Sequence, residues 1–475
     1  MAENIFPSAG RKYDARVFND PIHGHIELHP LCIRIIDTPQ FQRLRYIKQL
    51  GGCYLVFPGA SHNRFEHSIG VSHLAGKLAK AIQQRQPELA ITDQDILCVQ
   101  IAGLCHDLGH GPFSHMFQDF IHTVRQSKEW KHEKASVQMF EHLLEENNLR
   151  PVFESYRLTP SDIIFIKEQI AGPFDEEITR QIVANKRNGI DVDKWDYFAR
   201  DCYHLGIKSG FDHHRFIGFC RVISDDGVMQ ICNRDKEVFN VYDMFHIRSV
   251  LHRTAYQHKT AKIVEIMITE ALQKADEFIM IEGKDGKCKI SRCIDDMVAY
   301  TKLTDNIYHN ILYSSDPCLS EARDILRRIE SRKLYKCVGH TKPSESSKAS
   351  VSKGDGAKIR EQIASSVKNS SGEPLITVDD IVLSPVLFRR RQFVKIDYGK
   401  EEDNPIDRFR FYAKSDLNKA ISIKKEQVSP MLPSYFSYQF MVVYSRKLDS
   451  ESIKNISTGF KSWCKKNNLM ECEVT

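Results

Sequence analysis

Apolar residues recur at helical spacing over most of the first 335 residues. One predicted helix runs from residue 63 to about residue 85, with the apolar positions Ile69, Leu74, Leu78 and Ile82 on one face. A second begins at Thr92 with Asp95 as its capping partner and carries the stripe Leu97, Ile101, Leu104 and Leu108. Further helical patterns cover about 38–50, 134–148, 160–171, 176–186, 241–280 and 317–332. These patterns predict a mainly α fold.

Strand-like patterns are confined to two regions. Residues 221–224 and 228–232 flank Asp226-Gly227 and predict a short β-hairpin. Four further strands, at 381–387, 393–398, 408–413 and 438–444, precede a helix at about 450–468. Between these regions, residues 341–372 hold nine Ser, five Lys and three Gly, a composition typical of a flexible loop.

The patterns divide the chain into four parts. Residues 1–30 are predicted to be an irregular N-terminal arm, 31–335 a helical domain, 336–376 a flexible Ser/Lys-rich loop, and 377–475 a smaller α+β lobe. A chain of 475 residues with 41% hydrophobic and 27% charged residues has the composition of an ordinary globular protein. The net charge of +5 is compatible with polyanionic ligands without requiring them.

The lack of a recognisable targeting signal and the scattered cysteines predict an intracellular protein. The N-terminus lacks a basic stretch followed by an apolar one, and no apolar run approaches the roughly 20 residues that span a bilayer. The thirteen cysteines are scattered and form no Cys-x-x-Cys pair. We therefore expect free thiols, a reducing compartment and no membrane segment.

The densest candidate chemistry lies between Gly103 and His115. A His106-Asp107 doublet ends a predicted apolar helix, and His110 and His115 follow within a Gly- and Pro-containing segment. Adjacent residues on a helix point about 100° apart, but at a helix end both side chains can turn toward one cation. The doublet is therefore a candidate metal site.

Two more candidate ligands lie near the starts of other predicted helices. If these helices pack together, His67 and Asp193 join the doublet in a mixed nitrogen and oxygen site. Such a set suits Fe, Zn or Mn and leaves coordination positions for water and substrate. Spacing alone also permits a structural hydrogen bond or a helix cap for each.

The order His67, His106-Asp107, Asp193 resembles the HD superfamily of metal-dependent phosphohydrolases. Three longer strings, 57–67, 105–115 and 185–201, closely resemble the vertebrate deoxynucleoside triphosphate triphosphohydrolases that carry a SAM and an HD domain. The likeness extends from about Asn19 to the C-terminal helix and does not include the SAM domain.

The resemblance implies hydrolysis of a dNTP to a deoxynucleoside and inorganic triphosphate. It implies that His115 donates a proton to the leaving 5′-oxygen, that His132 and Asp191 support it, and that His110 binds the α-phosphate. The triphosphate would be held by the cationic and hydroxyl side chains of Arg64, Lys194, Tyr197 and Arg248. Gln49 and Asp201 would hold the 3′-hydroxyl, while Leu50 and Tyr256 would pack against the 2′ carbon and exclude a ribose.

Two activator sites follow from the same resemblance. A guanine-specific site for GTP or dGTP would use Arg16, Val17, Asp37, Gln42 and Arg45. A second site, for any dNTP with Mg²⁺, would use Asn19, Val56, Phe57, Arg215, Arg234, Lys236, Asn240, His258 and Lys259. Filling both sites would assemble an active homotetramer. The resemblance also implies dNTP depletion that restricts viral reverse transcription, in the nucleus, with the cytoplasm as the alternative.

Two other functions stay open on the residues alone. The first is another HD-type nucleotidase or phosphodiesterase, which would release a monophosphate or cleave a diester. The second is a single-stranded nucleic-acid-binding protein with an inactive HD site. Scattered rather than striped Lys and Arg argue against the second.

Overall fold

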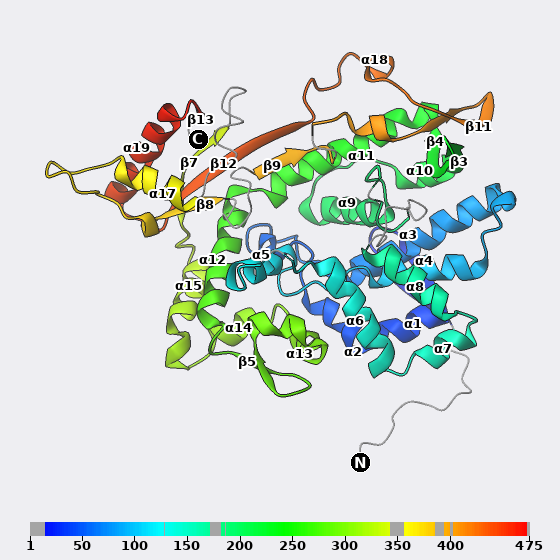
Figure 1. Cartoon of the computed structure of the whole chain (residues 1–475), viewed down its shortest axis with the longest axis horizontal. Helices are drawn as coiled ribbons and strands as arrows, with labels where there is room; N and C mark the ends of the chain where they lie inside the picture. The colour runs from blue at the N-terminus through cyan, green and yellow to red at the C-terminus, as the bar shows by residue number, and fades with distance from the viewer. Residues whose placement is uncertain are drawn as a thin grey trace.

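The chain folds mainly into α-helices, as its periodicity predicts (Figure 1). A computed structural model describes residues 15–127, 129–171, 182–185, 187–342, 356–384, 394–399 and 402–472. The longer helices among them are α3 (Arg64–Arg85), α4 (Asp93–Cys105), α5 (His115–Val124), α6 (His132–Glu146), α8 (Pro160–Ala171), α9 (Val192–Leu205), α11 (Val238–Leu251), α12 (Lys259–Ala275), α15 (Ser320–Glu330), α17 (Gly356–Ser365) and α19 (Ser450–Lys466). The shorter ones are α1 (Pro30–Ile36), α2 (Pro39–Gln42), α7 (Arg150–Ser155), α10 (His213–Phe219), α13 (Met297–Lys302), α14 (Ile307–Leu312) and α18 (Lys425–Val428).

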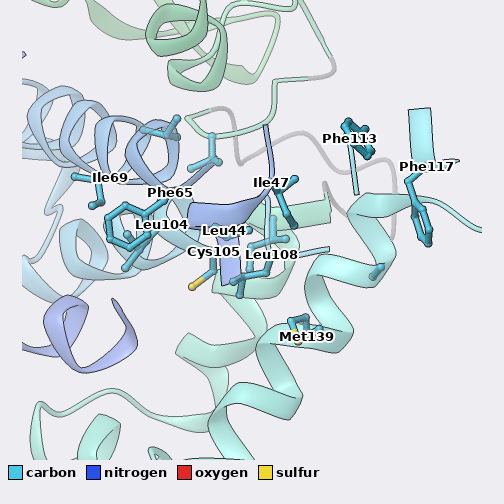
Figure 2. Close-up of a cluster of buried hydrophobic side chains, with 14 of the residues drawn as sticks. Leu44, Ile47, Phe65, Ile69, Leu104, Cys105, Leu108, Phe113, Phe117 and Met139 are labelled. Atoms are coloured by element: carbon cyan, nitrogen blue, oxygen red, sulfur yellow. The ribbon is translucent and has the colours of Figure 1, made fainter. Parts of the chain in front are cut away.

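Local capping fixes the two helices that carry the site. Asn63 and Glu66 form a capping box at the start of α3, and Thr92 and Asp95 form another at the start of α4. The two helices pack against each other, and their apolar faces enter the main core. Figure 2 shows part of this core, where the labelled side chains of Leu44, Ile47, Phe65, Ile69, Leu104, Cys105, Leu108, Phe113, Phe117 and Met139 are buried.

The segment predicted as one helix over 38–50 is shorter and irregular. Thr38 does cap α2, but α2 ends at Gln42 and a 3₁₀ turn ends at Tyr46. The amide of Lys48 bonds the Asp305 carboxylate, and the amide of Gln49 bonds the His62 carbonyl. These distant partners replace the carbonyls that a continuing helix would supply, so tertiary contacts override local propensity.

The N-terminal arm is not irregular over its described part. Strands β1 (Arg16–Asp20) and β2 (Gly24–Leu28) form an antiparallel hairpin that pairs Arg16 with Leu28 and Asp20 with Gly24. Gly24 has φ +72°, which glycine adopts without the strain of a side chain. Residues 1–14 lie outside the described residues.

The middle of the chain contains the predicted β-hairpin and a second hairpin that the hydrophobic pattern does not predict. Strands β3 (Arg221–Asp225) and β4 (Val228–Arg234) pair through Asp226-Gly227. The run predicted as helical over 241–280 is divided, because a π-helical turn (His252–Tyr256) and residues 257–258 separate α11 from α12. A second hairpin, β5 (Met280–Glu282) with β6 (Lys287–Lys289), interrupts the helical region. The predicted helix at 176–186 falls mostly on residues outside the described ranges.

The C-terminal lobe is an α+β unit with two sheets. One sheet has the order β13 (Met470–Cys472), β7 (Lys336–Lys342), β12 (Ser437–Ser445) and β8 (Ile381–Ser384), with β9 (Val394–Asp397) also pairing with β12. Helices α17 and α19 cover it over a second apolar cluster that includes Ile363, Val443 and Phe460. The other sheet joins β10 (Phe411–Ala413) in parallel to β4 and adds β11 (Asp416–Ile421).

Both ends of the predicted Ser/Lys-rich loop, 336–376, are ordered. The first end forms β7, whose Thr341 pairs with Met441 of β12, and the other forms α17, whose Ile363 is fully buried. The low apolar content of this region predicts neither element, because only a few apolar side chains pack each of them into the C-terminal lobe. Residues 343–355 lie outside the described residues.

Two expectations concern the chain as a whole. Every helix within the described ranges is too short or too polar to cross a lipid bilayer. The twelve cysteines whose side chains the structure describes carry free thiols, and the Sγ atoms of Cys288 and Cys293 lie 3.6 Å apart.

Asp305 joins three segments around the site, and its titration predicts a pH dependence of stability. Its carboxylate accepts the amide N–H groups of Lys48 (2.8 Å) and Phe113 (2.6 Å). Burial raises its pKa to about 7, above the ordinary 3.8. A carboxyl with a raised folded-state pKa contributes stability below its unfolded pKa, and this contribution is lost as pH rises through the folded pKa.

We therefore expect the free energy of unfolding, relative to the Asp305→Asn variant, to fall by about 1–4 kcal/mol between about pH 4 and pH 7. Urea denaturation of both proteins across this range measures the difference and cancels the contribution of other carboxylates. A difference independent of pH would contradict the assignment.

Candidate active site

Four predicted ligands converge where α3, α4 and α9 meet. The Nε2 atoms of His67 and His106 lie 3.2 Å apart. Asp193 Oδ1 lies 3.1 Å from the first and 3.3 Å from the second, while the Asp107 oxygens lie 3.4 Å from each ring nitrogen. The ligand atoms of His67, His106 and Asp107 are all within 4.8 Å of one another. The predicted packing of these helices is therefore present.

Hydrogen bonds outside this cluster turn both imidazoles toward it. His67 Nδ1 lies 2.7 Å from Asp196 Oδ2, and His106 Nδ1 lies 2.7 Å from the Gly103 carbonyl. An acceptor at Nδ1 places the proton there and leaves the Nε2 lone pair free. Two lone pairs that face each other across 3.2 Å repel unless a cation or a proton lies between them.

The spacing of the donors fits a transition-metal ion. Donor atoms bound at about 2.1 Å lie roughly 3.0 Å apart at right angles and roughly 3.4 Å apart at tetrahedral angles. The separations of 3.1–3.4 Å that join Asp193 and Asp107 to the two histidines fall in this interval. The electrostatics agree. Burial lowers the pKa of His67, but hydrogen bonds to Asp193 and Asp196 outweigh it and raise the pKa to about 10. The carboxylates therefore make the cluster favourable for positive charge.

Asp196 is a functional residue that the sequence prediction missed. It accepts hydrogen bonds from His67, from His23 (2.7 Å) and from two nitrogens of Arg200 (2.8 and 2.9 Å), all buried. Its only local signal is the spacing to Arg200, which on a helix is also typical of an exposed salt bridge.

Gly70 leaves the space that the Asp196 and Arg200 side chains occupy. A Cβ added at Gly70 would lie 1.9 Å from Asp196 Oδ1 and 2.6 Å from an Arg200 nitrogen. We expect Gly70→Ala to destabilise the protein by about 1–3 kcal/mol through overpacking, despite the better helix propensity of alanine, and to weaken metal binding by displacing Asp196.

Thermal denaturation and metal titration measure these two effects. Gly218→Ala is the matched control, because a Cβ at that helical glycine meets no atom within 4 Å. Equal behaviour of the two variants would contradict this role for Gly70.

A pocket of about 410 Å³ opens beside the cluster. Eleven predicted site residues line it: Gln49, Leu50, Arg64, Asp107, His110, His115, His132, Asp193, Tyr197, Asp201 and Tyr256. Other lining residues with polar or ionic side chains were not predicted: Asp119, His252, Gln257, Lys262 and Glu265. These five lie mostly in or beside α11 and α12, where an amphipathic pattern does not reveal which polar residues turn inward.

Three imidazoles form one wall of the pocket. His110 stacks on His132 with ring centroids 4.0 Å apart, and His115 meets both rings edge-on at 5.0 and 5.2 Å. Burial lowers the pKa of His110 and His115 well below the usual value, and it lowers the pKa of His132 as well. With lowered pKa values, all three rings are neutral at pH 7.

The predicted cationic residues lie at different places around the pocket. Arg64 is buried, with Nη1 2.5 Å from Asp107 Oδ2 and Nε 2.9 Å from Ser114 Oγ. Lys194 and Arg248 are not among the lining residues. Lys194 pairs with Asp191, the N-cap of α9, at 2.8 Å. Arg248 contacts the lining residue His252 and lies 3.3 Å from Asp397.

The residues predicted for activator binding lie outside the pocket lining. In the first set, Arg16 pairs with Asp37 at 3.0 Å and Arg45 bonds Gln42 at 2.8 Å, with Val17 exposed nearby in β1. In the second set, Arg215 pairs with Glu237 at 2.6 Å, and the Lys236 ammonium lies 4.0 Å from the centre of the Phe219 ring. Other members of this set make contacts of their own: Phe57 with His258, Asn240 with Asp212, and Arg234 with Asp235.

Comparison with known proteins assigns this chain to a family. Residues 64–201 match the HD domain and residues 211–382 match the HD associated region. The chain is 55% identical to deoxynucleoside triphosphate triphosphohydrolase SAMHD1 of Gallus gallus, covering 96% of this chain and 76% of that protein. Identity is 53% to SAMHD1 of Homo sapiens (96% and 74% covered) and 38% to a SAMHD1 homolog of Dictyostelium discoideum (96% and 82%). The chain therefore belongs to the SAMHD1 family of HD-domain proteins.

Proposed function

We propose that this protein is a metal-dependent deoxynucleoside triphosphate triphosphohydrolase, which cleaves a dNTP to a deoxynucleoside and inorganic triphosphate. The observation that carries the proposal is the pair of imidazole Nε2 atoms that face each other with carboxylate oxygens 3.1–3.4 Å away, where the two carboxylates line a 410 Å³ pocket. The names of the relatives specify the substrate class that such a centre would act on.

The four ligands would be His67, His106, Asp107 and Asp193. A Fe, Zn or Mn ion held by these residues would lower the pKa of a coordinated water and would polarise the α-phosphoryl group, while Mg²⁺ would accompany the nucleotide. Asp196 and the Gly103 carbonyl orient the two histidines, so that little rearrangement is needed on binding.

His115 would donate the proton that the leaving 5′-oxygen needs. Burial and the neighbouring charges lower the pKa of this ring, so that it is neutral at pH 7. A triphosphate brings several negative charges beside it, which favour the imidazolium form and create the proton donor in the complex. His132 is in edge-on contact with His115 and can stabilise that orientation. We assign Asp191 a supporting role through its ion pair with Lys194.

Cationic side chains would hold the triphosphate. Arg64 joins the ligand Asp107 to the pocket, so it can bind phosphate oxygen without leaving the metal centre. We add Lys262, a half-buried lysine in the pocket lining that bonds Glu265 at 2.7 Å. Lys194 and Arg248 would reach the far phosphates, and His110 and Tyr197 would bind from the wall.

We also propose nucleotide activation through assembly. The exposed Arg16–Asp37 and Arg45–Gln42 pairs offer a carboxylate and guanidinium groups that match the donor and acceptor edges of guanine. We assign this site to GTP or dGTP, the second set of activator residues to a dNTP, and the active form to a homotetramer. Residues 1–30 and 377–475 would be its regulatory parts, and depletion of nuclear dNTP would restrict reverse transcription.

One assay tests the activity. The purified chain is incubated with dATP and Mg²⁺, with and without GTP, and products are resolved by ion-exchange chromatography. Deoxyadenosine and tripolyphosphate that appear only with GTP support the proposal in full. Release of dAMP or of single phosphates would instead point to another HD-type nucleotidase. Turnover independent of GTP would remove the activation but leave the activity.

A further inference from the structure

One corner of the pocket presents two side chains that can accept hydrogen bonds from a ligand. Gln49 and Asp201 are both buried and both line the pocket. The Gln49 Oε1 atom is buried and has no hydrogen-bond partner within the described structure. A buried acceptor without a partner is costly, so a donor group on a ligand is expected to satisfy it.

Asp201 supplies the second acceptor. His62 Nε2 lies 2.6 Å from Asp201 Oδ1, and the Tyr256 hydroxyl donates to Asp201 Oδ2 at 2.5 Å. Each carboxylate oxygen can accept two hydrogen bonds, so each retains a free lone pair. A hydroxyl has one hydrogen, which it can donate to the Asp201 carboxylate or share with Gln49 Oε1, so this pair of acceptors matches a small polar ligand group such as a hydroxyl.

His62 holds both members of this acceptor pair. Its side chain fixes Asp201, and its backbone carbonyl accepts the amide N–H of Gln49 at 3.0 Å. The ring is itself immobilised, because it stacks on His204 with centroids 4.3 Å apart and an interplanar angle of 15°. His204 in turn bonds the Gly59 carbonyl at 3.2 Å.

We infer that His62 is a positioning residue for sugar recognition, which aligns Asp201 and Gln49 as the acceptors of the substrate's 3′-hydroxyl. The inference rests on the proposed dNTP hydrolysis and adds a residue that acts without touching substrate. Without the His62 donor, the Asp201 carboxylate keeps only the Tyr256 hydroxyl and can rotate away from the hydroxyl position.

The test compares dATP with 2′,3′-dideoxyATP, which lacks the 3′-hydroxyl, using the full chain with Mg²⁺ and GTP. A hydrogen bond to a charged acceptor predicts that the wild type prefers dATP by about 10- to 100-fold in kcat/KM. His62→Ala should lower kcat/KM for dATP about tenfold and that for dideoxyATP less than twofold. His62→Gln, which retains an amide N–H donor, should recover most of the preference.

His204→Ala is the matched comparison, because it removes the stacked ring but keeps the His62–Asp201 bond, and its loss of preference should be smaller than that of His62→Ala. An equal loss of both substrates in His62→Ala would overturn the inference and indicate a structural role. A wild type that hydrolyses both nucleotides equally well would also overturn it, while triphosphate release would still support the proposed function. Calorimetric dissociation constants of both nucleotides on a His115→Ala background give the same comparison without turnover, so an inactive enzyme still decides the question.

Discussion

Alanine at both His106 and Asp107 is expected to abolish hydrolysis of dATP. The change removes two of the four proposed ligands, one imidazole and one carboxylate. Activation of water and stabilisation of phosphoryl charge by a metal are worth several kcal/mol, and each 1.4 kcal/mol is a factor of ten in rate. The expected fall in kcat is on the order of a thousandfold or more.

Metal content and stability measured on the same samples locate the cause. Emission spectrometry should find no stoichiometric Fe, Zn or Mn in the variant, whereas the wild type should retain one ion per chain. The thermal midpoint should also fall, because Arg64 loses the Asp107 carboxylate that neutralises it at 2.5 Å. Asp196→Asn should give a milder result, a loss of about 10- to 100-fold in metal affinity, since it keeps all four proposed ligands and acts on the cluster through the orientation of His67.

A control must show that activity is lost because the proposed metal centre is removed, and not because any histidine and any aspartate have been replaced. His25 and Asp324 are exposed and lie in β2 and α15, outside the pocket lining. Their double replacement by alanine should retain activity and metal. Full turnover by the His106/Asp107 variant would show that the metal assignment is wrong.

The cluster of candidate ligands was predictable because each of its residues lies at a position that local sequence determines. Capping boxes fix the starts of α3 and α4, so the positions of His67 and of the doublet at the end of α4 follow from helical spacing. The N-cap Asp191 fixes the start of α9 and therefore the position of Asp193. That these helices meet at one point is long-range packing, which the family resemblance implied and spacing did not.

The residues that support the site were not predictable in the same way. Asp196 and Arg200 have the spacing of a surface pair, and only the tertiary fold buries them against His23 and Asp20. His62 precedes α3 within a predicted motif, but its partner Asp201 lies 139 residues further along the chain. The helix predicted over 38–50 was wrong for the same reason, because hydrogen bonds to distant partners outweighed local propensity. The β5–β6 hairpin was not predicted because its strands are short and their pairing leaves little pattern in the sequence.

Replacement of Arg200 is expected to cause the largest loss of stability among single changes. Its guanidinium is fully buried and donates to Asp196 through Nε (2.9 Å) and Nη2 (2.8 Å) and to Asp20 through Nη1 (2.8 Å). Burial disfavours the charge, but the two carboxylates more than compensate and raise the pKa of Arg200. Without the guanidinium, two buried carboxylates lose their shared cation.

Arg200→Met should therefore lower the free energy of unfolding by about 3–5 kcal/mol, measured by urea denaturation. Arg200→Lys should restore only part of this loss, because an ammonium cannot make the forked contact with Asp196. The control is Arg327→Ala, which removes an exposed arginine 3.6 Å from Asp324 and should cost less than about 1 kcal/mol. Because Asp196 also orients His67, both Arg200 variants should bind metal more weakly while the control binds it normally. A loss in Arg200→Met no greater than that of the control would mean that this network does not join β1, α3 and α9.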